Sequence, residues 1–267
     1  MVGKTNIPKE IDMSTHFKST ALTQNEIEEG LRQIGLSRGD IVEVHSSLSS
    51  FGWVEGGAAA VVDALMHVVT EEGALVMSAY PVSKPLPLTR EEIDRGVLAK
   101  VRMYDFDYDG TTGMGVIADE FYHRPGTILG AGFHRVCVWG KNAELLSEGY
   151  HRLLEKDGLV LLLGVGITCC SSMHQAEKVG IPSQITDYFK LPDDLRQEYP
   201  ENIYVSYGST PENAWEKVRI EAEDRGLIKR HKIGAAECMS FKARSVVGIY
   251  EDALKKDPYG LFGIKIN

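Results

Sequence analysis

The first half of the chain alternates helix-like apolar stripes with short apolar runs of strand length. A capping box at Thr23 and Glu26 opens the first stripe. Residues 41–46 then follow a strand pattern, and the apolar run over residues 58–70 has the length of a helix. Residues 74–79 read as the next strand. A strand, a crossover helix and a strand in this order predict a parallel, right-handed unit.

The second half continues this alternation and then becomes polar. We expect a helix over residues 115–122, a strand over 135–139 and a helix over 142–154, followed by the apolar strand run LVLLLGVG at 159–166. The stretch 183–211 is polar and contains three prolines. Such a composition is typical of irregular structure, so we predict a long excursion over the surface there.

The remaining elements complete an α/β pattern. A helix is expected over residues 213–225, a strand over 233–238 and a last helix over 243–249. No linker, internal repeat or low-complexity tract divides the sequence. Residues 1–267 are therefore predicted to form a single α/β domain, in which residues 1–20 are an irregular N-terminal arm.

Composition adds an expectation about the cell compartment. The longest apolar runs are shorter than the roughly 18 residues that a membrane-spanning helix needs, so no membrane association is expected. The N-terminal stretch lacks the apolar core of a signal peptide. The four cysteines show no disulfide framework. These features favour a protein of the reducing cytoplasm. We expect a monomer or a homodimer.

Charge narrows the partners. The formal net charge of −9 argues against nucleic acid, whose phosphates need a basic surface. An acidic surface favours cationic small molecules through electrostatic steering. Acidic residues that serve solubility alone account for much of this charge in many proteins.

The most informative residues are His174 and Glu177. They follow the apolar run at 159–166, and Ser171 is placed to act as the N-cap of a helix. His174 would then lie in the first turn, where the helix dipole favours the neutral imidazole that a general base requires. Glu177 falls on the same helix face and could orient the ring or bind a cation. The alternative is a capped helix with two ordinary surface residues.

A second candidate site is the Ser- and Gly-rich loop over residues 46–57. It leaves a strand and enters a helix just after Gly56 and Gly57, so hydroxyls, backbone N–H groups and a positive dipole end meet there. This combination suits a phosphate, although the loop is neither a P-loop nor a GxGxxG motif. The alternative is a plain strand-to-helix connection.

Two further clusters carry weaker signals. Asp105, Asp107 and Asp109 imitate an EF-hand loop, but the position that needs a bidentate glutamate is Val116, so ammonium groups are better ligands for them than calcium. Cys169 and Cys170 lie close to His174 in the sequence, and they lack a second pair of ligands at zinc spacing. A Cys–His nucleophile pair is the more serious reading, and two buried thiols that close a strand end are the alternative.

Taken in order, these motifs resemble a known family. The segments VEVHSSLSSFGWVEGGAAAVVDAL, LVMSAYP, TTGMGVIADEFYHRPG, LLLGVG, SSMHQAE and HKIGAA occur in the order found in the aminoglycoside 3-N-acetyltransferases, which are distinct from the GNAT acetyltransferases. The resemblance runs from about Leu22 to Phe262. It implies a three-layer α/β/α fold with a mixed, largely parallel sheet.

The resemblance also implies a reaction, namely transfer of the acetyl group of acetyl-CoA to the 3-amino group of a 2-deoxystreptamine ring, without a metal. The catalytic histidine and its acidic partner match His174 and Glu177, and Ser171 keeps the hydroxyl of a family threonine. The acceptor is expected to contact Tyr80, Asp107 and Glu177. The acetyl-CoA site is assigned to eight residues: Ser46, Ser47, Leu48, Ser49, Phe51, Gly52, Met114 and Gly115.

Two departures from the family pattern concern the walls of the pocket. The stretch 128–138 lacks an Arg-Ser and Pro pattern of many members, and residues 142–158 are shorter than in many members. Both leave the acceptor open. Another primary amine, Cys-dependent acyl transfer, and a CoA- or antibiotic-binding module without turnover remain the alternatives.

Overall fold

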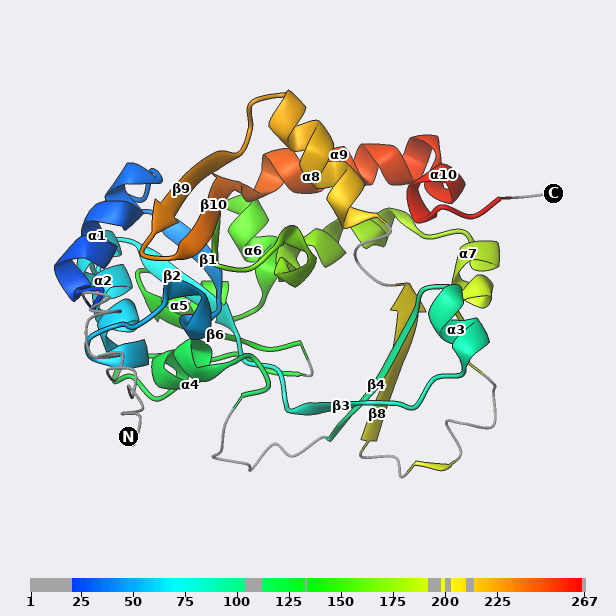
Figure 1. Ribbon diagram of the computed structural model, residues 1–267, viewed down its shortest axis with the longest axis horizontal. Coiled ribbons are helices and arrows are strands. Elements are labelled where there is room, and N and C mark those ends of the chain that lie inside the picture. Colours follow the sequence, from blue (N-terminus) through cyan, green and yellow to red (C-terminus); the bar gives the residue numbers. More distant parts are fainter. Residues whose placement is uncertain are drawn as a thin grey trace, which may run out of the picture.

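The computed structural model places a broad sheet covered by helices next to a smaller sheet (Figure 1). The predictions for residues 1–20 and for Asp105, Asp107 and Asp109 lie outside the residues that it describes. Those residues are 21–103, 112–132, 134–191, 198–199, 203–209 and 214–265.

The main sheet is mixed. Its strand order is β5-β6-β2-β1-β7-β10-β9. β1 is parallel to both of its neighbours, β2 and β7, whereas the outer pairings are antiparallel. It follows that, among the strands that the structure describes in this sheet, β6 and β10 run against the common direction, as expected for a largely parallel sheet. The strands are β1 (Ile41–Ser46), β2 (Ala74–Ser78), β5 (Ile128–Leu129), β6 (Val136–Gly140), β7 (Leu159–Leu163), β9 (Lys229–Ile233) and β10 (Ala236–Lys242).

The predicted parallel unit near the start of the chain is confirmed. Thr23 caps α1 (Gln24–Gln33), and its backbone N–H donates to the carboxylate of Glu26 over 2.8 Å, which completes the capping box. β1 then leads through α2 (Gly57–Val69) into β2, which lies parallel to β1. The apolar stripe of α2 packs against α1 and β2.

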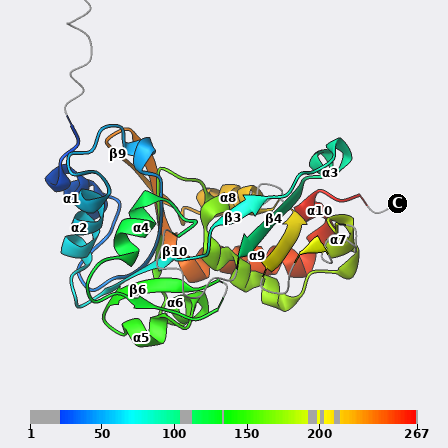
Figure 2. The ribbon, with the colours of Figure 1, turned by 90° about the horizontal axis from the view of Figure 1, so that it is seen from below.

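Helices cover both faces of the main sheet. On β1, Val42 and Val44 point into a core shared with α1, α2 and α4 (Val116–Tyr122). The neighbouring strand residues Val76 and Val160 point into a second core on the opposite face. That face is covered by α5 (Ala143–Leu146), α6 (Tyr150–Glu155), η4 (Ser171–Val179) and α9 (Ala243–Lys256). In Figure 2, β6 runs between α4 on one side and α5 and α6 on the other. The expected three-layer α/β/α arrangement is confirmed.

A second, antiparallel sheet was missed by the sequence analysis. β4 (Val97–Met103) pairs with β8 (Ile203–Ser209) along its whole length, and β3 (Ser83–Pro85) lies on its other edge. The prediction of an irregular excursion over 183–211 is therefore wrong where the structure describes this stretch. It contains β8 and the helix α7 (Ser183–Tyr188). β8 was missed because its partner β4 lies about a hundred residues away.

This small sheet joins the second core. Val97 and Ala99 of β4 are buried in the same apolar cluster as Val160 of the main sheet. Helix α3 (Arg90–Asp94) precedes β4, and α10 (Pro258–Phe262) packs on α9. Among the described residues, no helix is both long enough and apolar enough to cross a bilayer.

Three predicted elements have different bounds. The helix expected over 142–154 is broken, because Gly149 takes φ of +127° between α5 and α6. The strand expected over 233–238 spans a hairpin turn, so its residues belong to the ends of β9 and β10. The helix at 243–249 continues to Lys256, and α8 (Trp215–Asp224) forms as predicted within its described residues.

Candidate active site

The Ser-rich loop is fixed against the end of β7. It leaves β1 as a short 3₁₀ helix, η2 (Leu48–Phe51). The Oγ of Ser50 donates to the carbonyl oxygen of Gly164 over 2.9 Å. Gly164 has φ of +70°, and a Cβ atom there would overlap the Cβ of Ser50. β7 therefore ends at Leu163, short of the predicted 166, because the chain turns here and lets the loop approach.

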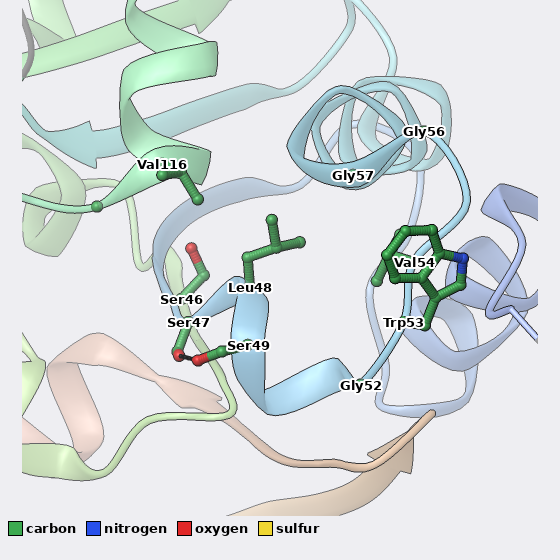
Figure 3. Close-up of a pocket in the computed structure, with 11 residues that line it drawn as sticks. Ser46, Ser47, Leu48, Ser49, Gly52, Trp53, Val54, Gly56, Gly57 and Val116 are labelled. Carbon is green, nitrogen blue, oxygen red and sulfur yellow. Dashed lines mark hydrogen bonds between the residues drawn. The ribbon is translucent and has the colours of Figure 1, made fainter. Parts of the chain in front are cut away.

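This loop forms one wall of a pocket of about 740 Å³ (Figure 3). Six of the eight residues assigned to acetyl-CoA line it: Ser46, Ser47, Leu48, Ser49, Gly52 and Gly115. The others do not. Phe51 is buried in the apolar core to which α2 belongs, and Met114 packs against both cores. Five further residues line the pocket, which are Trp53, Val54, Gly56, Gly57 and Val116. The first four belong to the loop 46–57 that was expected to bind an anion, whereas Val116 was not expected at the pocket.

The start of α2 faces this pocket. Gly56 caps the helix in a left-handed conformation, and Gly57 is its first residue. The first N–H groups of a helix lack partners within the helix and carry the positive end of its dipole. Hydroxyls of Ser46, Ser47 and Ser49 lie at the opposite side of the opening in Figure 3. The pocket thus joins donors that suit phosphate with apolar side chains such as Leu48 and Val116.

His174 lies on η4, which differs from the predicted helix. It is a 3₁₀ helix, and it begins at Ser171 after Cys170, without any side-chain cap. The prediction that Ser171 is the N-cap is therefore wrong. The Ser171 hydroxyl instead lies 3.0 Å from the Oγ of Ser78 at the end of β2. Ser171 is already helical, so its backbone N–H needs an acceptor from elsewhere.

Glu177 holds the imidazole of His174. The Nδ1 atom of His174 lies 2.9 Å from one carboxylate oxygen of Glu177, and the Tyr250 hydroxyl donates to the other over 3.2 Å. The indole of Trp215 packs edge-on against the imidazole at 4.9 Å between ring centroids. We assign the ring proton to Nδ1, since a carboxylate accepts it there. Nε2 is then left as a proton acceptor, on a side chain that is 57% exposed.

Tyr250 is a dependable donor in this chain of contacts. It is buried in α9, and burial raises the pKa of its hydroxyl far above its ordinary value, with the charge of Glu177 adding to the shift. The hydroxyl therefore stays protonated at neutral pH. It fixes Glu177, which in turn orients His174.

Two side chains of β1 contact the start of η4. The backbone N–H of Ser172 donates to Oε1 of Glu43 over 3.0 Å, and that of Ser171 donates to Nε2 of His45 over 3.2 Å. Glu43 and His45 also contact each other at 2.7 Å. His45 lies near the end of β1, next to the Ser-rich loop. Its ring links the Ser-rich loop to the helix of His174.

A second buried polar contact adjoins this pair. Ser78 lies 2.6 Å from the hydroxyl of Tyr150, in addition to its contact with Ser171. Burial raises the pKa of Tyr150 well above its ordinary value, and the charge of Glu43 adds to the shift. Tyr80, which was expected to stack on the acceptor, is only 8% exposed, and its ring packs edge-on against His134. Contact with an acceptor would require this ring to become more exposed.

The cysteines differ in exposure. Cys170 is fully buried, and burial together with the charge of Glu43 raises the pKa of its thiol well above the usual value. A thiol held in its protonated form is a poor nucleophile. Cys169 is exposed. Within the part of the chain that the structure describes, no three His, Cys, Asp or Glu residues gather as a metal site would require.

Five residues of this region were not expected from the sequence: Glu43, Ser78, Tyr150, Trp215 and Tyr250. Only Glu43 carried a signal that could have found it, because a charged residue stands between the apolar Val42 and Val44 in the strand. The others reach the site from β2, α6, α8 and α9.

Comparison with known proteins assigns the family. The sequence profile of the family described as Aminoglycoside 3-N-acetyltransferase matches residues 44–255. The SPbeta prophage-derived aminoglycoside N(3')-acetyltransferase-like protein YokD of Bacillus subtilis (strain 168) is 31% identical over 274 residues, covering 91% of this chain and 95% of that protein. Aminoglycoside N(3)-acetyltransferase III of Salmonella sp is 28% identical over 255 residues, covering 84% of this chain and 88% of that protein.

Solved structures agree with this assignment. The crystal structure of YokD from Bacillus subtilis matches with a TM-score of 0.65 at 29% identity, covering 89% of this chain and 94% of that chain. The structure of AAC-IIIb in a binary complex with CoASH matches with a TM-score of 0.64 at 18% identity, covering 88% and 96%, and shares the fold. The family profile covers most of the chain, and the relatives cover nearly all of it. The chain is therefore an enzyme of the aminoglycoside 3-N-acetyltransferase family.

Proposed function

We propose that this protein transfers the acetyl group of acetyl-CoA to the 3-amino group of the 2-deoxystreptamine ring of aminoglycosides, and so gives resistance to them. The observation that carries the proposal is the exposed imidazole of His174, oriented by Glu177 at the carboxyl edge of the parallel strands. Open α/β sheets bind their ligands at this edge.

The reaction needs a base and no covalent intermediate on the protein. The acceptor ammonium loses one proton before it reacts. The free amine then attacks the thioester carbon, and Nε2 of His174 accepts the second proton as the C–N bond forms. The C–S bond breaks with its electron pair on sulfur, and the imidazolium of His174 gives its proton to that sulfur, so that CoA leaves as the thiol and the base is regenerated. Glu177 stabilises the imidazolium that exists between these steps.

The proposed acetyl-CoA site is the pocket between the Ser-rich loop and α2. Its hydroxyls and the N-terminus of α2 suit the phosphates, and Leu48 and Val116 offer apolar contact to the pantetheine arm. His45 connects this wall to the helix of His174. Relatives of this family include a protein solved with CoASH, which supports the same co-substrate here.

The acceptor is proposed to be a polycation. The net charge of −9 and the carboxylate of Glu177 beside the base favour ammonium groups, and the relatives are named for aminoglycosides. Exposed ion pairs contribute only about 0.2–1 kcal/mol each and weaken in salt. The acceptor KM should therefore rise with ionic strength. Asp107 remains part of this proposal.

The decisive experiment measures thiol release from acetyl-CoA with gentamicin-like and apramycin-like aminoglycosides and with simple primary amines. Fragmentation mass spectrometry then locates the acetyl group on the product. We expect acetylation of the 3-amino group of at least one aminoglycoside. Acetylation only of another amine would assign a different acceptor within the family. Binding of acetyl-CoA without any transfer would point to a binding module.

A matched pair of variants tests the pocket. Val116→Glu places a negative charge beside the expected phosphates, and we expect the acetyl-CoA Kd to rise about three- to tenfold. Ile220→Glu, at a similarly exposed apolar residue of α8 outside the pocket, should leave the Kd unchanged. Equal affinities of the two variants for acetyl-CoA, measured by calorimetry, would show that acetyl-CoA does not bind in this pocket.

A second pair of variants tests whether acetyl transfer depends on a cysteine. Cys169→Ala and Cys170→Ala, alone or together, should keep most of the turnover, since direct transfer needs no thiol. A folded double variant that binds acetyl-CoA normally but transfers nothing would instead favour an acyl-enzyme, which mass spectrometry of the unaltered protein would then trap.

A further inference from the structure

Glu43 occupies a position that packing alone would give to an aliphatic residue. It lies in the middle of β1, the central strand, and is completely buried. Its neighbours in register are Val76 of β2 and Val160 of β7, both of which are buried in the second core. Burying a carboxyl group between aliphatic side chains disfavours folding unless its oxygens are well paired. Its presence here therefore needs an explanation.

The pairing of Glu43 is incomplete. Oε1 accepts the N–H of Ser172 and lies 2.7 Å from Nε2 of His45. Oε2 is buried and has no hydrogen-bond partner among the described residues. A group chosen only to stabilise the core would be satisfied at both oxygens, or replaced by an apolar side chain.

What Glu43 does contact is the beginning of η4. This helix has no side-chain cap of its own at Cys170. Its first two N–H groups, from Ser171 and Ser172, are accepted by the β1 side chains His45 and Glu43. The first N–H groups of any helix need such acceptors from outside. The central strand thus supplies the cap and holds the first turn of η4 in one place.

We propose that Glu43 is a positioning residue that acts through His45 and the first turn of η4 to place His174 and Glu177 for acetyl transfer. His174 lies only two residues beyond Ser172, on the same short helix. A shift of this turn on the sheet would carry the imidazole with it, and misplacement by about 1 Å can cost about a hundredfold in rate. The inference rests on the proposed function for its rate measurement.

The test replaces Glu43 with leucine and, in a second variant, with glutamine. Glu43→Leu removes the acceptor and fills the space with an apolar side chain, and such replacements of buried charges are often neutral for stability. We expect a folded protein whose kcat falls about 10- to 100-fold while the Kd of acetyl-CoA changes less than about twofold. Glu43→Gln keeps an oxygen for the N–H of Ser172, so it should lose less, about two- to fivefold.

The matched control is Ser240→Ala. Ser240 is also buried and polar on the main sheet, but its hydroxyl donates to the carbonyl oxygen of Ile34 on the opposite face. This variant should lose some thermal stability and keep the kcat of the unaltered protein. A merely structural role for Glu43 would give that same result, with a lower melting temperature and an unchanged kcat.

A readout without turnover separates this inference from the proposed function. Long-range ¹⁵N–¹H spectra report the tautomer and surroundings of the His174 ring, assigned with His174→Ala. We expect its signals to shift in Glu43→Leu and to stay in place in Ser240→Ala. Unchanged His174 signals and more than half of the normal kcat in folded Glu43→Leu would overturn the inference. Absence of acetyl transfer by the unaltered protein would overturn the proposed function, and the spectra would still decide the role of Glu43.

Discussion

The two faces of β1 contrast in what they contain. On the face toward α1, α2 and α4, Val42 and Val44 enter an apolar core. On the other face, Glu43 and His45 alternate with them along the same strand and meet the start of η4. The register of β1 therefore separates an apolar layer from a layer in which polar groups are buried beside the candidate active site.

This contrast gives the two faces different roles, since one stabilises the fold and the other positions the side chains of the candidate active site. The apolar face gains free energy from burial and needs no particular partner for each atom. The polar face gives up part of that gain, and in return its contacts are directed hydrogen bonds. Tyr250 and His174 both donate to Glu177, and the first N–H groups of η4 donate to side chains of β1. Changes on the first face should alter unfolding, and changes on the second should alter turnover.

The largest effect is expected for His174→Ala. Loss of the base should lower kcat by about 10²–10⁴-fold, while the Kd of acetyl-CoA stays nearly the same. The control is His67→Ala on α2, an exposed histidine of the opposite face that contacts Glu28. Steady-state kinetics and calorimetry check both variants. A His174→Ala enzyme with more than about a third of the normal rate would contradict the assignment of the base.

A change in the apolar core should have the opposite effect, lowering stability and leaving turnover intact. Leu65 of α2 is fully buried there, and Leu65→Ala should lower the free energy of unfolding by about 2–5 kcal/mol through lost burial and a cavity. The kcat of the molecules that remain folded should be unchanged. Urea unfolding gives the first quantity and active-site-normalised kinetics the second. A large loss of kcat in folded Leu65→Ala would show that the two faces are coupled.

The pattern of the sequence was sufficient to predict the apolar layer and most of the main sheet. The capping box at Thr23, the strand at 41–46 and the helix after it have local signals, and the structure confirms each of them. The small sheet has no such signal, because β8 acquires its meaning only when it pairs with β4. Pairing between strands that are distant in the sequence cannot be predicted from a short local stretch of residues.

The candidate site, like the fold, was predictable where its contacts are local in the sequence and not where they are long-range. His174 and Glu177 are three residues apart, so their contact follows from helix geometry. Phe51 was misassigned because a loop residue can turn inward, and nothing local distinguishes it from its neighbour Gly52, which lines the pocket. Tyr250 reaches Glu177 from α9, over seventy residues later in the chain, so only the fold reveals it.

The dependence of unfolding on alkaline pH tests the burial of two thiols on the apolar face. Burial raises the pKa of Cys137 on β6 and of Cys238 on β10 from 9.0 to about 11. The unfolded thiols ionise first, so stability is complete below about pH 9 and falls as the pH rises toward 11. The loss should be about 2–3 kcal/mol per thiol. Urea midpoints across this range should fall less steeply in the double variant Cys137→Ala/Cys238→Ala, and parallel slopes would contradict the burial argument.

The smallest effect concerns the second partner of Glu177. Tyr250→Phe removes the hydroxyl that donates to Oε1 of Glu177 and leaves the buried ring in place. One such hydrogen bond is worth about 0.5–1.5 kcal/mol, so kcat should fall about two- to tenfold while the unfolding free energy changes little beyond this amount. Tyr259→Phe is the control, because its hydroxyl donates to Gln184 away from His174. If Tyr250→Phe and Tyr259→Phe had equal kcat values, Glu177 would hold His174 without help from α9.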